Sequence, residues 1–363
     1  MTLRPDEKIQ KALFSTPSRF VGEYETEGVL LTHAWPGFHD RFASVRWQEG
    51  PASRSAYIFA FKTEAIEKGP GIPLPDYSPT GGIVAAYLSV LFGKRFDSHG
   101  LVEGSGFYHI PELSEFGTLA NPSLPQNSHK PRPDFEIPLN LSEMSRFSPL
   151  LSGGSLPIDF IHTFQGSAKF YSQALRNFEK DPEVSYLHLI SAGEILSNFH
   201  DFDKLDLLDD TTKEYLASIR KSLDNGEKVA SHIEGRLLLV KRRFVETIVG
   251  LVDASFFEKS EAGDGIGSLK AESFRKSISA AYDLRSKYVH TGAPFGNWVT
   301  SQMGGRNKEV QVGKPVISDK DLSKILEYAP TLVGLERVVR YCLLQFALRH
   351  GAFIKSESTA SDA

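Results

Sequence analysis

Hydrophobic and polar positions follow two different periodicities along the chain. In the first third, short apolar or aromatic runs alternate with clusters of Pro, Gly and Ser, which is typical of strands joined by turns. The runs cover residues 28–32 (GVLLT), 43–47 (ASVRW) and 56–61 (AYIFAF), and one helix is expected over 82–96. This pattern predicts a β-rich or mixed module over residues 1–120.

A proline-rich stretch follows that module. Residues 121–141 read NPSLPQNSHKPRPDFEIPLNL and contain five prolines. Proline removes a backbone donor and clashes with the preceding helical turn, so this stretch is not expected to form a helix or a central strand. We predict an extended linker over 121–156, or a segment draped over a neighbouring part of the protein.

From residue 157 onward the apolar positions recur with helical spacing. Helices are expected over 160–179, 184–199, 211–223, 229–257, 271–290 and 319–349, the last kinked at Pro330. The polar end, 353–363, is expected to be a disordered tail. The predicted fold class is therefore α+β, with an all-α helical bundle over 157–352.

The composition limits the possible functions. Charged residues make up 24% of the chain and the net charge is −4, so a protein that coats nucleic acid non-specifically is excluded. Any polyanion must be bound by a local basic patch. The single cysteine, Cys342, excludes an intrachain disulfide and fits a cytoplasmic location. No signal peptide is expected, and the apolar run at 82–93 is too short to span a membrane.

Residues 283–292, DLRSKYVHTG, hold the strongest chemical signal. At 100° per residue, Arg285 falls in the middle of the apolar stripe of its helix, between Phe274 and Ile278. A guanidinium there needs an acidic partner or an anionic ligand such as a phosphate. His290 precedes a helix stop at Gly292, where the helix dipole favours imidazolium. An ideal helix places His290 about 140° from Arg285, so only the long arginine side chain could bring both groups to one phosphate.

A structural interpretation competes with this catalytic one. Arg285 could only pair with a buried acid, and His290 could only cap the end of its helix. Glu194 is the best such acid, because Leu187 and Ile190 flank it on an apolar helix. It could orient Arg285 for catalysis or form a purely structural ion pair.

Two further sets of residues bear on ligand binding. Lys241, Arg242 and Arg243 interrupt an apolar helical pattern, so they either contact an RNA backbone or form a solvated face. The histidines of the first third lack the spacing of a zinc site, and no Walker-type loop is present. No metal and no cofactor is therefore expected. The histidines are His33, His39 and His109.

Three segments together resemble HEPN domains, most closely the Apea-like HEPN group. LRSKYVH at a helix end resembles the family's arginine-to-histidine motif, while FYSQALRNFEKD and SYLHLISAGEILSNF resemble its first two helices. The resemblance covers about 157–352. It implies a helical bundle that is often dimeric, and in many members a metal-independent endoribonuclease; other members bind nucleotides or mediate assembly, and Apea-like members are often associated with bacterial defence against phage.

Carried over, the resemblance assigns Arg285 and His290 as the catalytic pair, with Ser286 and Glu194 supporting them. Catalytic members often have Asn, Asp or His after the arginine, and this chain has Ser286. We therefore expect a homodimeric endoribonuclease, a defence or toxin effector whose first module meets a trigger or partner. The alternatives are a non-catalytic HEPN module that binds a nucleotide or a protein, and an unrelated helical scaffold with His290 exposed and alone.

Overall fold

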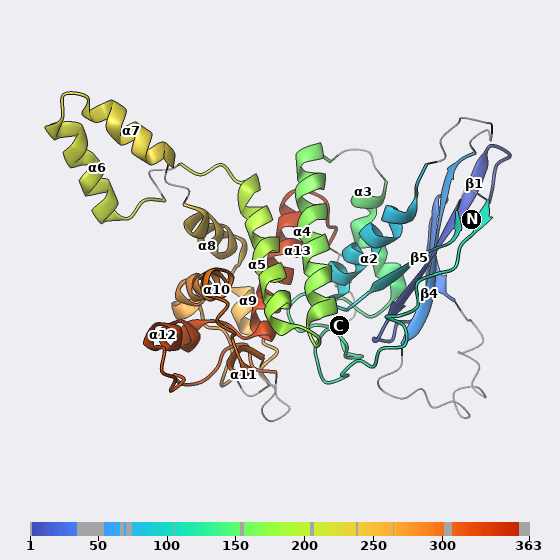
Figure 1. Ribbon diagram of the computed structural model, residues 1–363. Helices are drawn as coiled ribbons and strands as arrows, with labels where there is room; N and C mark the ends of the chain where they lie inside the picture. Colours follow the sequence, from blue (N-terminus) through green and yellow to red (C-terminus); the bar gives the residue numbers. More distant parts are fainter. Residues whose placement is uncertain are drawn as a thin grey trace, which may run out of the picture.

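The computed structural model describes residues 2–34, 54–65, 69, 75–104, 106–152, 156–203, 207–236, 239–263, 265–300 and 307–355. The predicted strand at 43–47 and the tail from 356 lie outside these residues. Figure 1 shows an antiparallel sheet at one end, layers of helices beside it, and a projecting helical hairpin at the other end. The chain therefore combines a sheet with many helices, as the α+β prediction requires.

The described strands form one six-stranded antiparallel sheet in the order β2-β3-β4-β1-β5-β6. Two of the predicted strands are present as β3 and β4, whereas β1 and β5 were not predicted. The bounds are β1 Glu7–Thr16, β2 Tyr24–Glu25, β3 Val29–His33, β4 Ser55–Glu64, β5 Asp97–Gly104 and β6 Phe107–Tyr108.

The centre of the sheet is β1, which pairs along its whole length with β4. Its first half reads EKIQK and is polar, so the sequence alone gives no strand-like alternation there. From Ala12 onward the strand is buried on both faces, and the rings of Phe14 and Phe59 stack with centroids 5.6 Å apart. Cross-strand aromatic contacts of this kind stabilise the pairing of β1 with β4.

The predicted helix at 82–96 is α2, Ser78–Phe92, which packs against β1 and β5. Pro79 lies in its first turn, where the missing N–H costs nothing. Gly93 ends the helix with φ +61°, and a Cβ there would come within 2.7 Å of Arg132. Glycine is thus required both for the left-handed backbone and for the close approach of an arginine.

The helical layers follow in the order of the chain. The bounds are η2 Leu141–Phe147, α3 Ser148–Leu151, α4 Ile158–Asn177, α5 Pro182–Phe199, α6 Asp210–Ser222, α7 Gly226–Arg236, α8 Val240–Leu251, α9 Ser255–Glu258, α10 Ala271–Thr291, α11 Asn297–Thr300, α12 Lys320–Tyr328 and α13 Leu332–Arg349. Helix α4 packs on both α2 and α5, and α13 packs on α4, α5 and α8. One hydrophobic core runs from the sheet through these helices, so the modules predicted from sequence share it.

Two helix predictions are wrong in their continuity. The long helix expected at 229–257 is divided into α7, α8 and α9, and Leu239 between α7 and α8 has φ +41°, which an α-helix does not permit. The helix expected at 319–349 is not merely kinked at Pro330 but divided into α12 and α13. Thr331 begins α13 by accepting a hydrogen bond from the N–H of Gly334 at 3.1 Å.

A buried charge network joins α13 to the proline-rich stretch and to α2. Arg132 donates to both oxygens of Glu336, at 2.9 and 2.6 Å, and to the carbonyl of Gly93 at 3.1 Å. Arg340 donates to Asp134 at 2.8 Å and to the Val90 and Leu91 carbonyls at 3.0 and 2.7 Å. The proline-rich stretch is therefore draped over the core, and two cations close the carbonyl end of α2.

A second network anchors the sheet to α4. Asp97 at the start of β5 is 1% exposed and lies 2.5 Å from Arg54 and 2.8 Å from Arg95. Arg176 of α4 approaches the same carboxylate at 2.9 Å. One carboxylate thus holds cations from the sheet and from the helical layer, because an unpaired charge at this depth would be strongly unfavourable.

Replacing Arg340 with methionine removes the partner of Asp134 and the donors to two helix-end carbonyls. We expect Arg340→Met to lower the free energy of unfolding by about 3–5 kcal/mol, the cost of leaving a buried charge unpaired. Urea unfolding followed by circular dichroism measures the change. Arg4→Met is the matched control, because the Arg4–Glu27 pair is exposed; equal losses in both variants would refute the importance assigned to the buried network.

The same network predicts a pH dependence. Burial alone would raise the pKa of Asp134, but Arg340, Arg132 and Arg337 lower it below its ordinary value of 3.8. A lowered folded-state pKa stabilises the fold above the unfolded value and ceases to do so as the pH falls through the folded value. The stability difference between wild type and Asp134→Asn should therefore be constant near neutral pH and shrink below 3.8. Urea unfolding between pH 7 and pH 3 tests this; a difference independent of pH would contradict it.

Candidate active site

The predicted motif lies on α10, which packs against α5, α8 and α12. The helix ends as predicted, with Gly292 at φ +66° and its N–H donating to the Tyr288 carbonyl at 2.8 Å. The buried residues of α10 include Ile278, Ala281 and Leu284. This buried face is centred to one side of Arg285, so Arg285 lies at its edge rather than in its middle, and its side chain is 26% exposed.

Arg285 is paired with the acid that the sequence indicated. Its Nη2 lies 3.3 Å from Oε2 of Glu194 on α5, and Glu194 is 19% exposed. The Tyr282 hydroxyl donates to Oε1 of the same carboxylate at 3.0 Å, and the Arg285 guanidinium lies 5.6 Å from the Tyr282 ring centroid. Burial, and next the Glu194 carboxylate, raise the pKa of Tyr282, so its hydroxyl stays a donor at neutral pH.

Most of the hydrogen-bonding capacity of Arg285 is unused. A guanidinium carries five N–H donors, and within the described part of the chain only one hydrogen bond, to Glu194, is formed. By contrast, Arg340 in the core donates from all three of its nitrogens. Arg285 is therefore held by one edge, with donors left for a further acceptor.

His290 occupies the last turn of α10 and is exposed, as is Val289 before it. Its imidazole makes no hydrogen bond or ion pair with any residue that the structure describes. Ser286 is half-buried, and its hydroxyl likewise has no partner among the described residues. Arg285 and His290 therefore share one helix and lie toward its open end, without contacting each other.

The three basic residues of α8 are all occupied by internal partners. Lys241 contacts both oxygens of Asp283 at 2.7 Å, and Arg242 contacts Asp209 and the Leu207 carbonyl. Arg243 donates to Asn198 at 2.9 Å and to the Ser197 carbonyl at 3.2 Å. These contacts tie α8 to α5, α10 and the hairpin segment. From the sequence we expected an RNA contact or a solvated face for these residues. We did not expect pairing with other residues of the chain.

Three residues around the site were missed by sequence reasoning. Tyr282 and Asp283 lie within the motif helix but were not assigned partners, and Lys287 pairs with Asp319 before α12 at 2.6 Å. The sequence position of Tyr282 could have indicated its role, because it lies three residues before Arg285 and therefore on the same side of the helix. The pairing of Lys287 with Asp319 could not be inferred, since it joins helices distant in sequence.

A close approach between α5 and α8 positions Glu194. A Cβ on Gly193 would lie 2.5 Å from a ring carbon of Phe244, so glycine is needed for the two helices to meet. The Phe244 ring in turn packs against Tyr282, with centroids 5.5 Å apart. Glu194 and Tyr282 are thus positioned by adjacent packed groups, which fixes the carboxylate that holds Arg285.

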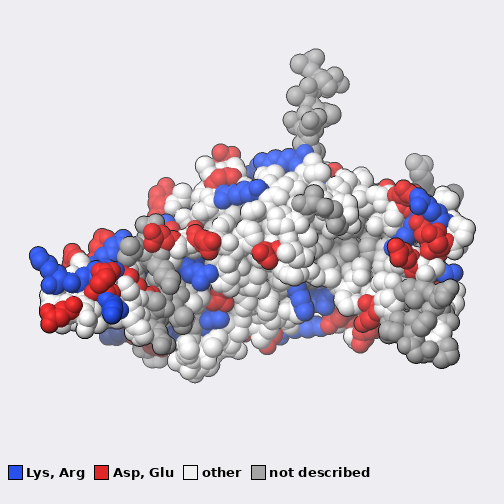
Figure 2. All heavy atoms as spheres, turned by 90° about the horizontal axis from the view of Figure 1, so that it is seen from above, with Lys and Arg blue, Asp and Glu red and all other residues white. Residues whose placement is uncertain are grey.

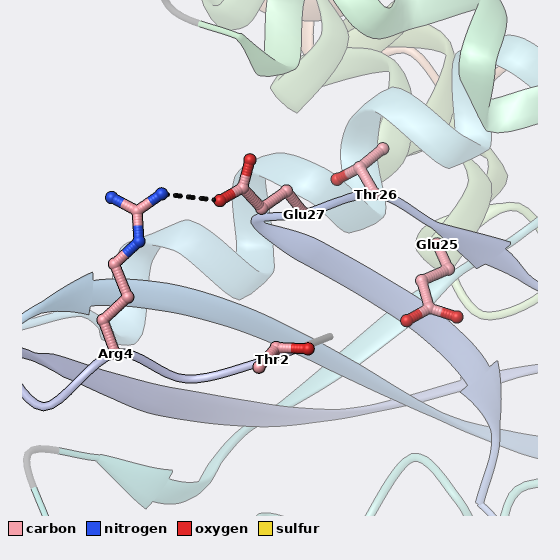
Figure 3. A pocket seen from close by; sticks show the side chains of 5 residues that line it. All are labelled: Thr2, Arg4, Glu25, Thr26 and Glu27. Atoms are coloured by element: carbon pink, nitrogen blue, oxygen red, sulfur yellow. Dashed lines mark hydrogen bonds and ion pairs between the residues drawn. The ribbon is translucent and has the colours of Figure 1, made fainter.

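The structure also contains a hollow away from α10. This hollow has a volume of about 630 Å³, lies beside the N-terminus and is lined by Thr2, Arg4, Glu25, Thr26 and Glu27, whose side chains are drawn in Figure 3. It lies on the sheet, far from α10 (Figure 1), and its Arg4–Glu27 ion pair, marked by the dashed line in Figure 3, is exposed to water. Within the described residues, no three His, Cys, Asp or Glu side chains are grouped closely enough to hold a metal.

Acidic and basic side chains are mixed on the surface of the molecule (Figure 2). Figure 2 shows basic and acidic side chains interspersed over one face of the molecule, most densely on the projecting hairpin. The described basic residues near α10 are largely paired, as for Lys241 and Lys287. An anion would therefore be drawn to this region by individual donors such as Arg285 rather than by a broad positive field.

Comparison of the chain with models of protein families, with curated proteins and with solved structures found no match to any of them. Among the described helices, none is both long enough and apolar enough to cross a membrane.

A double-mutant cycle on Arg285 and Glu194 measures how strongly the two are coupled. Because both side chains are partly exposed, we expect a coupling energy of about 0.5–1 kcal/mol from the unfolding of Arg285→Gln, Glu194→Gln and the double variant. A value of about 3 kcal/mol or more would mean that the ion pair is a sealed structural element, and would argue against a free ligand-binding arginine.

Proposed function

We propose that this protein is a metal-independent endoribonuclease of HEPN type that acts as a homodimer. The observation that carries the proposal is the state of Arg285: it is anchored by Glu194, it retains free donors among the described residues, and it precedes an exposed histidine on the same helix. A fixed cation and an available imidazole are the minimum equipment for cleaving a phosphodiester without a metal.

The reaction would use the ribose 2′-hydroxyl as nucleophile. An imidazole of His290 removes the proton from this hydroxyl, the 2′-oxygen attacks the adjacent phosphorus, and the bond to the 5′-oxygen breaks. An imidazolium returns a proton to the departing 5′-oxygen, leaving a 2′,3′-cyclic phosphate and a 5′-hydroxyl. Arg285 binds the phosphoryl oxygens and stabilises the charge that develops on them.

The remaining residues would support this chemistry. Glu194 holds Arg285, and Ser286 offers a hydroxyl to the phosphate or to His290. Lys241, Arg242 and Arg243 would contact the RNA backbone only by exchanging their present partners. Such an enzyme would work in the cytoplasm as a defence or toxin effector, with the sheet-containing module meeting its trigger or partner.

A non-catalytic HEPN module is the second candidate. It is favoured by the Arg285–Glu194 ion pair and by the internal pairing of the α8 basic residues, which both lower the affinity for RNA. In that case Arg285 would bind a nucleotide phosphate, or contact a partner protein, and His290 would do no chemistry.

Replacing His290 tests the proposed function directly. Purified wild type should cleave single-stranded RNA in the presence of EDTA and leave cyclic-phosphate ends, while His290→Ala should be at least about a hundredfold slower. Arg285→Lys should also be slower, because lysine keeps the charge but loses the bidentate fork. Gel analysis of end-labelled RNA gives the rates, and expression in bacteria with growth and total RNA followed gives the cellular effect.

The matched control is His162→Ala, an exposed histidine on α4 that should leave the rate unchanged. RNA that survives wild type, with nucleotide binding lost in Arg285→Ala, would select the non-catalytic module. RNA that survives, with phosphate-analogue binding indifferent to Arg285→Ala, would reject both.

A further inference from the structure

The hairpin formed by α6 and α7 has a small core of its own. Among the described residues, its buried apolar side chains are Leu208, Leu216 and Ala230, with Ile219 and Ile233 partly buried beside them. Helices α6 and α7 pack mainly on each other, and Figure 1 shows both projecting away from the body. Helices of this length are marginal in water unless an apolar face is covered.

The apolar residues of the hairpin extend beyond its own interface. At 100° per residue, Ile219 lies about 60° and Tyr215 about 100° to one side of the buried Leu216. In α7, Val229 lies about 100° to the same rotational side of the buried Ala230. Tyr215 is 67% exposed and Val229 is 37% exposed, so this side is uncovered.

The two sets of residues lie on one face of the hairpin. The helices are antiparallel and turn their buried residues toward each other, so equal rotations in the same sense bring Tyr215 and Val229 to the same side. We call this side the hairpin face, made of Tyr215, Ile219, Val229 and Ile233. It forms a continuous apolar strip across both helices.

Charged residues are segregated from the hairpin face. Arg220 pairs with Glu227 at 3.3 Å and with Glu234, and all three lie about 40–60° to the opposite side of the buried residues. The other described Lys, Arg, Asp and Glu side chains of α6 and α7 also fall outside the hairpin face. A hairpin exposed to water on both sides has no need of this asymmetry, because amphipathic helices turn their uncharged side toward a packing partner.

We propose that the hairpin face binds the same face of a second copy of this chain, so that two hairpins form a four-helix bundle. A two-fold contact places a surface against itself, which suits an uncharged face because no like charges meet. In such a bundle the two helices of one hairpin pack on the two helices of the other, and each hairpin face shields the other from water. A charged partner segment would find no opposite charge on this strip.

The size of the hairpin face sets the expected affinity. A helix of 13 residues is about 20 Å long, and two helices about 10 Å apart present roughly 400 Å² per copy. A total near 800 Å² is at the low end for specific contacts, so we expect a reversible dimer with a dissociation constant on the order of micromolar.

Sedimentation of the full chain between about 1 and 100 µM tests the proposal. Wild type should show a monomer–dimer equilibrium, and Tyr215→Glu should weaken it at least about tenfold, because it places an unpaired charge at the centre of the interface. Ala217→Glu is the matched control: it adds the same charge at an exposed position on the opposite side of α6 and should change the affinity less than about twofold. On α7, Val229→Glu is the corresponding test variant and Ser231→Glu is its control.

All four positions are exposed, so the variants should fold. Circular dichroism melting checks that they do. A wild type that stays monomeric at 100 µM, or a dimer that responds equally to both members of a pair, would overturn the proposal. The inference does not depend on the nuclease: dimers that Tyr215→Glu disrupts, without RNA cleavage, leave it standing and reject the proposed function. RNA cleavage by a dimer whose affinity is unchanged by Tyr215→Glu would support the proposed function and reject this inference.

Discussion

The fold depends on one buried arrangement of charge at the start of α13. Glu336, Arg337 and Arg340 lie within one and a half turns of that helix, each nearly inaccessible to water, and a charge at such depth is tolerated only when it is paired and hydrogen-bonded. Their partners come from distant parts of the chain: Arg132 and Asp134 from the proline-rich stretch, and backbone carbonyls from the end of α2. Apolar packing could accept these segments in several registers, but the paired charges allow few, so they define where the sheet module meets the helices.

The candidate active site uses the same kind of contact with a different outcome. Arg340 and Arg285 each face a carboxylate, yet Arg340 is enclosed and has every nitrogen occupied, whereas Arg285 is 26% exposed and makes one hydrogen bond to the described residues, at 3.3 Å. An enclosed, fully bonded arginine has no capacity for a ligand. A partly exposed one anchored on a single side is oriented without being saturated, which is the condition a phosphate-binding residue must satisfy. Glu194 therefore restrains Arg285 without excluding an anion from it.

Local pattern was enough to predict most helices, two of the strands and the Arg285–Glu194 pairing, because helix periodicity reports which faces are buried. It failed where the determinant is not local. Strand β1 begins with polar residues and is recognisable only from the two strands that enclose it, and the division between α7 and α8 contains Leu239, whose left-handed backbone leaves no pattern in the sequence. The sequence also gave no sign that Lys241 would pair with Asp283 across two helices. Charge networks between residues far apart in the chain leave no periodic pattern in the sequence, so the buried charge network of α13 could not be predicted.

The connectivity links the hairpin to the site. The chain leaves α5, which carries Glu194, runs through α6 and α7, and returns as α8, whose Lys241 and Phe244 contact Asp283 and Tyr282 of the motif helix. Two of the three helices against which α10 packs, α5 and α8, are thus the ones that the projecting hairpin connects. Arg242 strengthens this link, because it joins the beginning of α8 to Asp209 at the beginning of α6. The packing of α5 on α8 positions Glu194, and Glu194 in turn orients Arg285, so the hairpin is joined in the chain to both of the helices that determine the place of this carboxylate.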